Sequence, residues 1–288
     1  MTTEPDDHGA PVTTPKPVGH RAGAGLVVAA FDFDGTLTHG GSVWQFLVAV
    51  QGRRRVVAAG LALLGKLAAA ALFGGRYADE AKEALFRRTL AGLPADETAT
   101  RAAAFGLDHY RRRARTDVRQ QMEWHRARGH HLVIVSASLE TYLVPVGQEL
   151  GVDTVVATRL AVGADGRLTG GYDGANCRGA EKIARVRQWM EAQIETSTDH
   201  TTGAPAITAV LWAYGNSKGD RQLLRGADVG VDVGRLGRLG ALRGFRRLSD
   251  LPDLRDDDLG DDGAALTRSG GSSGRSSASP PGRQRRRR

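Results

Sequence analysis

Five short apolar segments, each bounded by glycine or polar turn residues, stand out along the middle of the chain. They predict strands at Leu26–Phe33, His131–Ser136, Val152–Thr158, Ile207–Tyr214 and Val229–Val233. Several segments are continuously apolar, which is typical of strands in a parallel sheet that is covered on both faces. Helical patterns lie between them, so the sequence predicts an α/β domain with a doubly wound parallel sheet. Within Leu160–Tyr172, the pair Asp165-Gly166 favours a β-hairpin turn.

The stretch between the first two predicted strands is about a hundred residues long, far more than one crossover needs. Its apolar spacing is helical, with a stripe at Val43, Phe46, Leu47 and Val50 and further helices predicted at Asp79–Leu90 and Glu97–Arg128. We therefore expect a helical cap, residues 43–115, inserted over the carboxyl edge of the sheet. The core domain then comprises residues 25–42 and 116–255.

The two ends of the chain differ in composition from the middle. Residues 1–24 are rich in Pro, Thr, Gly and charge and lack the apolar stretch of a secretory signal, so we expect a disordered leader. Residues 256–288 are first acidic and then rich in Ser, Gly and Arg, which predicts a disordered tail. Seven arginines and no acids lie in 266–288 and account for most of the net charge of +8. The remainder is nearly neutral, so the charge predicts no specific nucleic-acid partner.

Cys177 is the one cysteine of the sequence. A single cysteine excludes an intramolecular disulfide and a cysteine-rich zinc site. This composition fits a reducing compartment, and we expect a cytoplasmic protein.

An apolar strand runs directly into two aspartates in the sequence Asp32-Phe33-Asp34-Gly35-Thr36. Open α/β sheets bind ligands at the carboxyl ends of their strands, where these carboxylates are expected. Two neighbouring buried carboxylates need a cation, and a hard divalent ion such as Mg²⁺ prefers oxygen ligands. Gly35 and Thr36 predict a tight turn whose backbone N–H groups face an anion. The alternative is a solvated turn that happens to contain aspartate.

Further polar residues follow two later strands and lie on one helix. Ser136, with the backbone amide of Ala137, can donate hydrogen bonds to phosphate oxygens. Lys182 lies in a helical segment, and Asn216 and Asp220 follow the fourth predicted strand. Each feature alone has an ordinary alternative, such as a turn serine or a solvated lysine. Their order along the chain makes the set more specific than its members.

Taken together, these elements resemble the motifs of the haloacid dehalogenase superfamily of phosphohydrolases. The matching residues are Asp32 to Thr36, Ser136, Lys182 and Gly215 to Asp220. The helical insert resembles that of the subfamily with phosphoserine phosphatase and bacterial phosphatidylglycerophosphate phosphatase-like proteins. The resemblance covers about residues 26–250 and implies a Rossmann-like core with an inserted helical cap.

The resemblance also implies a role for each matching residue. Asp32 would attack phosphorus and form an aspartyl-phosphate, and Asp34 would protonate the leaving group and then activate water. The phosphoryl oxygens would be bound by Thr36, Ser136, Ala137 and Lys182. The cofactor Mg²⁺ would be held by Asp32 and by the backbone carbonyl of Asp34 or of an equivalent residue at this site. Asn216 and Asp220 would complete the metal site, directly or through water.

Asn216 departs from the family pattern, because related enzymes usually carry Asp at this position. Asparagine still offers a neutral carbonyl oxygen to Mg²⁺. It removes one negative charge, so we expect retained activity with a higher Mg²⁺ requirement.

The segment Glu83–Arg88 resembles the cap helix of phosphoserine phosphatases, in which an arginine binds the substrate carboxylate. Arg88 is the closest match. Those enzymes also carry a glutamate soon after the first motif, whereas residues 39–42 of this chain include no acid. A site for a zwitterionic amino acid needs a partner for both charges. Phosphoserine is therefore an alternative substrate and not the favoured one.

An apolar segment of 18 residues, Val56–Phe73, has one charge, Lys66, and follows Arg53–Arg55. One interpretation is a buried pair of cap helices, since the segment is barely long enough to cross a bilayer. The other is a hydrophobic lid or a surface that rests on the inner face of a membrane and admits a lipid phosphate. The three arginines would suit anionic headgroups.

The leading hypothesis is a Mg²⁺-dependent hydrolase of small-molecule or lipid phosphomonoesters. A second hypothesis is phosphoryl transfer to an alcohol instead of water. A third is a non-catalytic protein with a degenerate core that binds membranes or nucleic acid, as Asn216, the apolar segment and the basic tail suggest.

Overall fold

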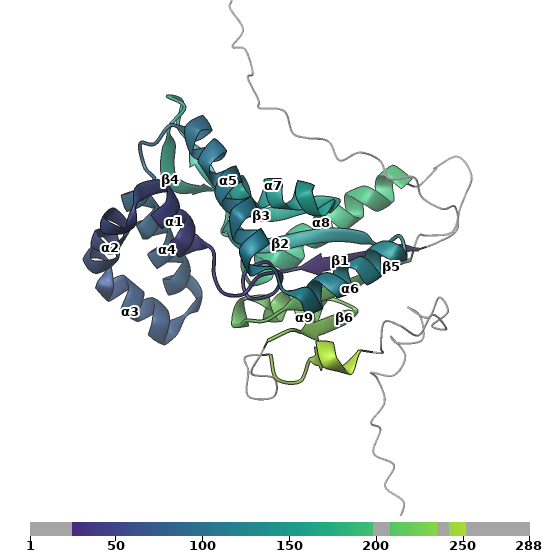
Figure 1. Ribbon diagram of the computed structural model, residues 1–288. Coiled ribbons are helices and arrows are strands. Elements are labelled where there is room, and N and C mark those ends of the chain that lie inside the picture. The colour runs from purple at the N-terminus through teal and green to yellow at the C-terminus, as the bar shows by residue number, and fades with distance from the viewer. Residues whose placement is uncertain (1–24, 198–207, 235–241, 252–288) are drawn as a thin grey trace, which may run out of the picture. The chain divides into compact units, whose positions relative to one another are not determined.

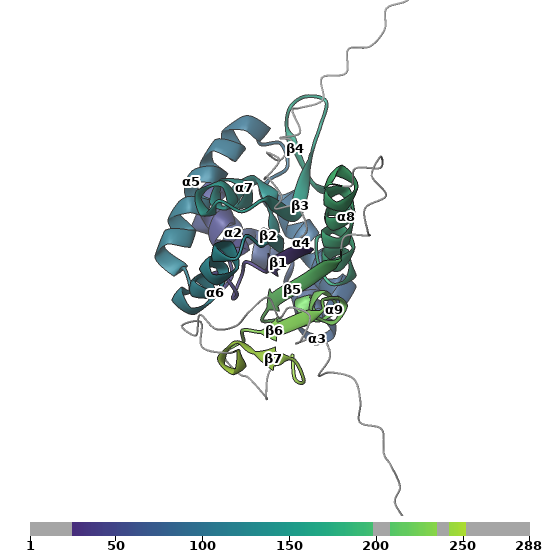
Figure 2. The same cartoon turned by 90° about the vertical axis from the view of Figure 1, so that its right-hand side faces the viewer.

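The computed structural model describes residues 25–197, 208–234 and 242–251. These residues contain a seven-stranded sheet in the order β4-β3-β2-β1-β5-β6-β7 (Figures 1 and 2). The strands are β1 (Leu26–Phe31), β2 (His131–Leu139), β3 (Thr154–Val162), β4 (Leu168–Asp173), β5 (Ala209–Gly215), β6 (Val229–Asp232) and β7 (Arg246–Arg247). Neighbouring strands pair in parallel, except β3 with β4. The predicted leader and tail lie outside the described residues.

Helices cover both faces of this sheet. The α-helices of the described residues are α1 (Val43–Gln51), α2 (Arg53–Ala62), α3 (Leu64–Phe73), α4 (Gly75–Thr89), α5 (Ala95–Arg113), α6 (Thr116–Ala127), α7 (Glu140–Leu150), α8 (Ala180–Ser197) and α9 (Arg221–Gly226). Figure 2 shows α6 and α7 on one face and α8 and α9 on the other. Ala30 of β1 joins a buried cluster with Val186 and Leu223, whereas the next residue, Phe31, packs edge-on against His125 of α6. Successive residues of β1 thus face opposite layers, and the predicted α/β fold with a doubly wound sheet is confirmed.

The five predicted strands are all present, with limits that shift by a few residues. β1 ends at Phe31, before the turn that carries Asp32, and β2 continues to Leu139. The predicted start of the fourth strand, Ile207, lies outside the described residues. The short edge strand β7 was not predicted.

The predicted hairpin is present as β3 and β4. The Gly163 N–H donates to the carbonyl oxygen of Arg167 at 2.7 Å, and Gly166 adopts a φ of +73°, which favours glycine. The hairpin also touches the helical insertion, since the Gly92 N–H donates to the carbonyl oxygen of Leu168 at 2.8 Å. The connection between α4 and α5 is therefore tied to this edge of the sheet.

The helical insertion predicted between the first two strands is present as α1 to α5. Its last helix, α5, packs along α7, a helix of the layer that covers the sheet. At their contact a Cβ added to Gly106 would lie 2.3 Å from the carbonyl oxygen of Tyr142. Since α5 is shared in this way, the limits 43–115 of a separate cap domain stay a prediction.

The single long helix predicted at Glu97–Arg128 is wrong, because the structure divides it into α5 and α6. Between them Ala114 has an extended backbone, with φ −56° and ψ 137°, and bridges to Thr38. The Arg115 N–H donates to the carbonyl oxygen of Leu37 at 2.9 Å. Pairing with the segment that leaves β1 thus interrupts a pattern that is otherwise helical.

The apolar segment Val56–Phe73 is divided between α2 and α3, which bend by 72° at their junction. No single helix among the described residues is long and apolar enough to cross a bilayer, although this bent pair meets both criteria together. The interpretation of a buried helix pair is wrong for α3, which contains no buried residue. α3 packs against α4, and its other side, with Leu64, Leu72 and Phe73, is exposed.

Candidate active site

The turn after β1 places two aspartates at the carboxyl edge of the sheet. The Asp32 N–H donates to a carbonyl oxygen of β5 at 3.0 Å and continues the strand pairing. The chain then turns back, with the Thr36 N–H donating to the Phe33 carbonyl oxygen at 3.2 Å. Gly35 adopts a φ of +80°, and a Cβ there would lie 2.2 Å from the side-chain amide of Asn216. Both its backbone conformation and this close neighbour therefore require glycine.

Lys182 of α8 joins two of the predicted site residues. Its Nζ donates to Asp32 Oδ1 and to Asp220 Oδ1, each at 2.6 Å. All three side chains are buried. The structure therefore brings together an aspartate after β1, a lysine of α8 and an aspartate after β5. The strand-end argument predicted the two aspartates, and the family resemblance implied the place of Lys182.

The three buried charges differ in how their surroundings shift their pKa values. Burial and the charge of Asp220 raise the pKa of Asp32 to about 7, and Lys182 offsets this only in part. Burial acts in the same direction on Asp220, but Lys182 and Ser217 outweigh it and hold the pKa of that carboxyl below its usual value. Burial acts to lower the pKa of Lys182, yet the two carboxylates raise it well above its usual value. Lys182 therefore stays protonated. Of the two carboxylates that it contacts, that of Asp32 is the less stabilised in its charged form.

The loop after β5 is closed by Asp220. Its Oδ2 accepts hydrogen bonds from Ser217 Oγ at 2.7 Å, from the Ser217 N–H at 3.0 Å and from the Asn216 N–H at 3.2 Å. The bond from the Ser217 N–H is one half of the capping box of a short 3₁₀ helix, Lys218–Asp220, and the Asp220 N–H donates to the Ser217 side chain as the other half. Thr36 Oγ1 lies 3.3 Å from both Asp32 Oδ2 and Asn216 Oδ1. The Asn216 side chain thus faces the turn after β1.

The Asp34 carboxylate is held by two serines. Its Oδ2 accepts hydrogen bonds from Ser138 Oγ at 2.6 Å and from Ser42 Oγ at 3.1 Å. The Tyr142 hydroxyl lies 2.7 Å from Ser42 Oγ and extends this network. Asp34 Oδ1 is buried and has no hydrogen-bond partner within the part of the chain that the structure describes. That oxygen therefore lacks the partner that a buried acceptor usually has.

β2 places Ser136 and Ala137 beside this turn, because β2 is the parallel neighbour of β1. Ser136 is buried, and its Oγ accepts the Ser138 N–H at 3.1 Å. The hydroxyl hydrogen of Ser136 therefore remains for donation.

Lys82 of α4 reaches the same edge from the helical insertion. Its Nζ donates to the carbonyl oxygen of Ala137 at 2.5 Å and to Asn176 Oδ1 at 3.0 Å. Asn176 Nδ2 in turn donates to Asp79 Oδ1 at 2.6 Å. Burial lowers the pKa of Lys82 to about 8, against the opposing charges of Asp79 and Asp34. Lys82 therefore links the insertion to β2 next to the predicted phosphate-binding residues.

Arg88 does not join this group of residues. It is exposed near the end of α4, and within the described ranges it makes no hydrogen bond or ion pair. Its contact with a substrate carboxylate stays a prediction. Lys82, on the same helix, is the residue that contacts the site.

Arg115 binds the backbone of the turn after β1. Its buried guanidinium donates to the carbonyl oxygens of Gly35 at 2.9 Å and Val233 at 2.7 Å. It also forms an ion pair with Asp117 at 2.5 Å. Arg115 lies where the predicted long helix is interrupted. That interruption therefore places a buried cation against the turn that carries Asp32 and Asp34.

Four residues of this site were missed in the sequence: Ser42, Lys82, Arg115 and Ser138. Ser138 had a usable signal, since it lies two residues after Ser136 and alternate strand residues share a face. The other three depend on how the insertion folds back onto the sheet, which no local pattern encodes.

The residues at this edge fit a hard divalent cation. Asp32 and Asp220 share the Lys182 ammonium, and Asp34 adds a third carboxylate, so negative charge is in excess. The Asp32 carboxylate and the Asn216 amide oxygen contact the same threonine hydroxyl and hence lie close together. Across the described segments no three His, Cys, Asp or Glu side chains are grouped as a metal site. A cation here would therefore take mixed carboxylate, amide and backbone oxygens, which suits Mg²⁺.

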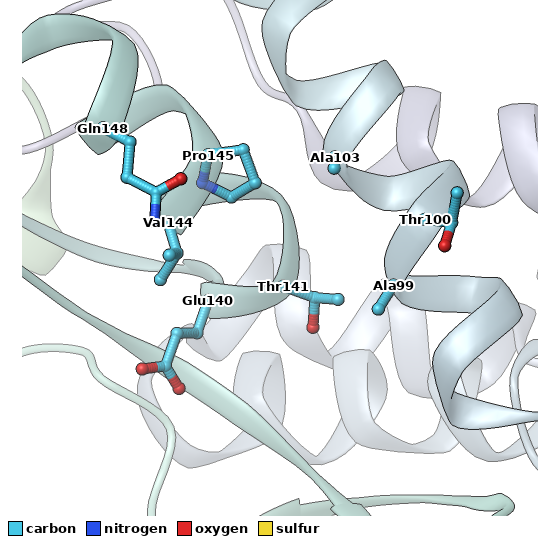
Figure 3. A pocket seen from close by; sticks show the side chains of 8 residues that line it. All are labelled: Ala99, Thr100, Ala103, Glu140, Thr141, Val144, Pro145 and Gln148. Carbon is cyan, nitrogen blue, oxygen red and sulfur yellow. The ribbon is translucent and has the colours of Figure 1, made fainter. Parts of the chain in front are cut away.

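A groove of about 520 Å³ lies elsewhere, between α5 and α7 (Figure 3). Its lining residues are Ala99, Thr100, Ala103, Glu140, Thr141, Val144, Pro145 and Gln148. None of them belongs to the polar group at the end of β1. The groove is therefore separate from the candidate active site.

Sequence comparison identifies relatives across this region. A model of the haloacid dehalogenase-like hydrolase family matches residues 29–225, which include the polar group from Asp32 to Asp220. Protein CicA from Caulobacter vibrioides is 33% identical over 213 residues, covering 74% of this chain and 88% of that protein. A histidinol-phosphatase from Neisseria meningitidis is 30% identical over 107 residues, covering 37% of this chain and 45% of that enzyme.

The fold is also similar to that of solved structures. A protein of unknown function from Bordetella pertussis aligns with a TM-score of 0.62 at 23% identity, covering 80% of this chain and 100% of that chain. A substrate-bound phosphoserine phosphatase aligns with a TM-score of 0.52 at 17% identity, covering 82% of this chain and 97% of that chain. At such identities the likeness concerns the fold.

Proposed function

Because the chain belongs to the haloacid dehalogenase-like hydrolase family, we propose that it hydrolyses phosphomonoesters through an aspartyl-phosphate on Asp32. One observation carries most of the weight: the Lys182 ammonium lies 2.6 Å from the carboxylates of both Asp32 and Asp220, at the edge where α/β enzymes bind ligands. A fixed ammonium there can stabilise the charge that develops on a phosphoryl group. Asp34 supplies the second carboxyl group that the reaction needs.

In the first step an Asp32 carboxylate oxygen attacks phosphorus, and the bond from phosphorus to the leaving oxygen breaks. Asp34, in its protonated form, donates its proton to that leaving oxygen. Asp34 Oδ1 suits this role, because Ser42 and Ser138 occupy the other oxygen and fix the carboxyl group. The products of this step are the free alcohol and an aspartyl-phosphate.

In the second step water attacks the phosphorus of the aspartyl-phosphate, and Asp34 accepts a proton from that water. The bond between phosphorus and the Asp32 oxygen breaks, which releases inorganic phosphate and restores both carboxyl groups. An alcohol in place of water would give phosphoryl transfer instead. Product analysis with added alcohols distinguishes these two outcomes.

Four groups are proposed to bind the phosphoryl oxygens: the hydroxyls of Thr36 and Ser136, the Ala137 amide and the Lys182 ammonium. Ser136 supports this role because its hydroxyl hydrogen remains for donation. The pairing of β2 with β3 is irregular between Val135 and Leu139, and Ala137 is the middle one of the three residues in that interval, which favours an available amide there. Donors fixed in advance stabilise the developing charge without reorganising during the reaction.

Mg²⁺ is the proposed cofactor, held by the Asp32 carboxylate, the Asn216 amide oxygen and the Asp34 backbone carbonyl, with Asp220 acting through water. The excess of carboxylates at this edge supports this choice. When bound, the ion supplies positive charge to the phosphoryl oxygens and lowers the pKa of Asp32.

The substitution Asp32→Asn tests the mechanism, because it keeps the side chain's shape and removes its charge. We expect turnover of p-nitrophenyl phosphate with Mg²⁺ to fall by about a thousandfold or more, and acid-quenched enzyme to carry no added phosphate mass. Asp153→Asn is the matched control, since Asp153 accepts a hydrogen bond from the Leu132 N–H at the opposite end of β2. Full activity in a folded Asp32→Asn variant would reject the proposal.

The substitution Asn216→Asp tests the metal site separately. It adds one carboxylate to a site that favours oxygen ligands, so the Mg²⁺ concentration for half-maximal activity should fall. We expect a decrease of about tenfold, measured by titrating Mg²⁺ at saturating substrate. An unchanged or raised requirement counts against Asn216 as a ligand.

Two observations on the insertion distinguish between classes of candidate substrate. Phosphoserine is not favoured, because Arg88 is exposed away from the polar group and residues 39–42 include no acid. A lipid phosphomonoester is a second candidate, because α3 exposes apolar side chains in the same insertion that carries Lys82 on α4. Turnover of phosphoserine, a short-chain lipid phosphate and a long-chain lipid phosphate at equal concentration distinguishes these candidates.

A further inference from the structure

The outer side of α3 is apolar, which is unusual for a helix at a protein surface. Leu64, Ala68, Ala71 and Leu72 repeat at helical spacing and are all exposed, and Lys66 is the charged residue of this helix. Leu64 is 60% exposed and Leu72 is 79% exposed. The side toward α4 is half-buried, and the opposite side exposes apolar side chains to solvent.

Large apolar side chains are exposed mainly in this part of the molecule. Among the described residues seven such side chains are exposed, and six of them come from α1 to α3: Trp44, Val57, Leu61, Leu64, Leu72 and Phe73. We call these six the apolar face. Figure 1 shows α2 and α3 at the end of the insertion that lies away from the strands. Exposed apolar groups concentrated in one region are typical of a binding surface.

The segment that carries the apolar face has charges of one sign, and the next acids, Asp79 and Glu80, follow on α4. Residues 43–78 contain four arginines and one lysine and no Asp or Glu. Arg53, Arg54 and Arg55 occupy the first turn of α2, which has no acid and no side-chain cap. The helix dipole makes that end positive already, so three arginines there are unfavourable without an anion.

We propose that α1 to α3 dock on an anionic phospholipid bilayer, with the apolar face inserted at a shallow depth and the basic side chains at the headgroups. Apolar insertion and headgroup attraction together are how interfacial helices bind membranes. A bilayer meets both features of the surface at once. A second copy of the chain would cover the apolar side chains but would bring two sets of five like charges together.

This docking does not depend on the proposed phosphatase activity. The Asp32→Asn variant should bind vesicles as the natural chain does, so failure of the catalytic proposal and failure of docking are distinguishable. If both hold, the bilayer brings lipid phosphomonoesters to α4, which follows α3 directly and carries Lys82.

The test measures co-sedimentation of the full-length protein with vesicles of phosphatidylcholine, with and without phosphatidylglycerol. We expect about tenfold or more tighter binding to the anionic vesicles. Leu72→Glu combined with Phe73→Glu should weaken that binding about tenfold or more, because two charges would have to enter the apolar layer. Val162→Glu is the matched control, since Val162 is also exposed, at 53%, but lies on β3, and it should bind as the natural chain does.

A second variant tests the charges without touching apolar residues. Arg53→Gln, Arg54→Gln and Arg55→Gln together should weaken binding to anionic vesicles about tenfold or more and reduce its salt dependence. A further full-length variant, in which Arg285 to Arg288 are replaced with serine, measures the contribution of the basic tail to vesicle binding. Binding that is lost with the tail change but unaffected by both helix variants overturns the proposal.

Sedimentation velocity without lipid tests the competing occupant. If the Leu72 and Phe73 variant converts a dimer to a monomer while vesicle binding stays unchanged, a second copy covers this face and the proposal is overturned. Because both residues are exposed, the variant should melt within a few degrees of the natural chain. Loss of vesicle binding by a folded monomer supports docking.

Discussion

Asp32 and Asp220 share one ammonium, yet the two carboxylates have different surroundings. Asp220 also accepts three hydrogen bonds from Ser217 and Asn216, so its pKa is held below the usual value. Asp32 has the Thr36 hydroxyl at 3.3 Å as its further side-chain contact, and its pKa is raised to about 7. A buried carboxyl group left less stabilised than its neighbour is typical of a residue that reacts.

Lys82 gives a prediction at the scale of the single residue. Burial lowers its pKa from 10.5 to about 8, so between these values the unfolded chain holds a proton that the folded chain has lost. The free energy of unfolding therefore rises with pH across this window, and the cost of burying the charge is largest below about pH 8. The change in the free energy of unfolding caused by Lys82→Met should be most favourable to the variant at neutral pH. This relative stabilisation should shrink as the pH approaches about 10.

Thermal unfolding at both pH values measures this change, with the exposed Lys66→Met as the matched control. A difference between Lys82→Met and the natural chain that is the same at neutral and alkaline pH contradicts a lowered pKa of Lys82 in the folded chain.

Part of this residue-level picture could be predicted from the sequence. Asp32 and Asp220 follow adjacent parallel strands, so their convergence follows from the general position of ligands in α/β sheets. Ser42 and Lys82 could not be found in this way, because neither follows a strand of the sheet: Ser42 precedes α1 and Lys82 lies on α4. Their contacts with β2 depend on the packing of the insertion, which short sequence patterns do not encode.

At the scale of elements, the contact between α5 and α7 depends on a glycine. A Cβ at Gly106 would lie 2.3 Å from the carbonyl oxygen of Tyr142, closer than packed atoms allow. Gly106→Ala should therefore lower the free energy of unfolding by about 1–3 kcal/mol, despite the better helix propensity of alanine. Chemical denaturation measures the change.

Gly65 of α3 provides the control for this prediction. A Cβ there meets nothing within 4 Å, so Gly65→Ala should stabilise the protein by about 0.5–1 kcal/mol through helix propensity alone. If both alanines stabilise the protein, α5 and α7 are not in close contact.

Two errors at this scale have physical reasons. The break between α5 and α6 was missed because the hydrogen bonds of Arg115 to Leu37, Gly35 and Val233 cross the molecule. Of the two interpretations of the apolar segment, the buried helix pair was wrong for α3, because an apolar helix has the same sequence pattern whether it is buried or exposed. Both elements were correctly predicted to be helical, since local periodicity decides that property.

At the scale of the whole molecule, global stability should depend on the buried His125. Its Nε2 lies 2.8 Å from the Tyr214 hydroxyl and its Nδ1 lies 2.7 Å from His130 Nδ1. Burial, followed by the charges of His130 and Arg128, lowers the pKa of His125 well below its usual value. The unfolded chain binds a proton at about pH 6.5 that the folded chain does not, so this histidine lowers stability as the pH falls through that value.

His125→Gln removes this contribution and makes it measurable as a difference. The stability advantage of the natural chain over the variant should be larger at about pH 7 than at about pH 5, as followed by thermal melting. An advantage that is equal at both pH values, or larger at the lower one, contradicts a histidine that stays neutral in the folded state.

The fold class itself was predictable because buried parallel strands are continuously apolar and alternate with helices. The edge strand β7, with the two residues Arg246–Arg247, carries no such signal. The order of the strands in the sheet could not be predicted from the sequence either, since pairing partners such as β1 and β5 are far apart along the chain.

The bridge between Thr38 and Ala114 bears on how this architecture can diversify. The chain departs from the sheet and comes back to it on neighbouring backbone segments, so both attachment points stay fixed when the number of intervening residues changes. The bent pair α2–α3 can then be lengthened, exchanged or shortened without displacing β1. New specificities can evolve in that helix pair while the phosphate chemistry beneath it is inherited intact.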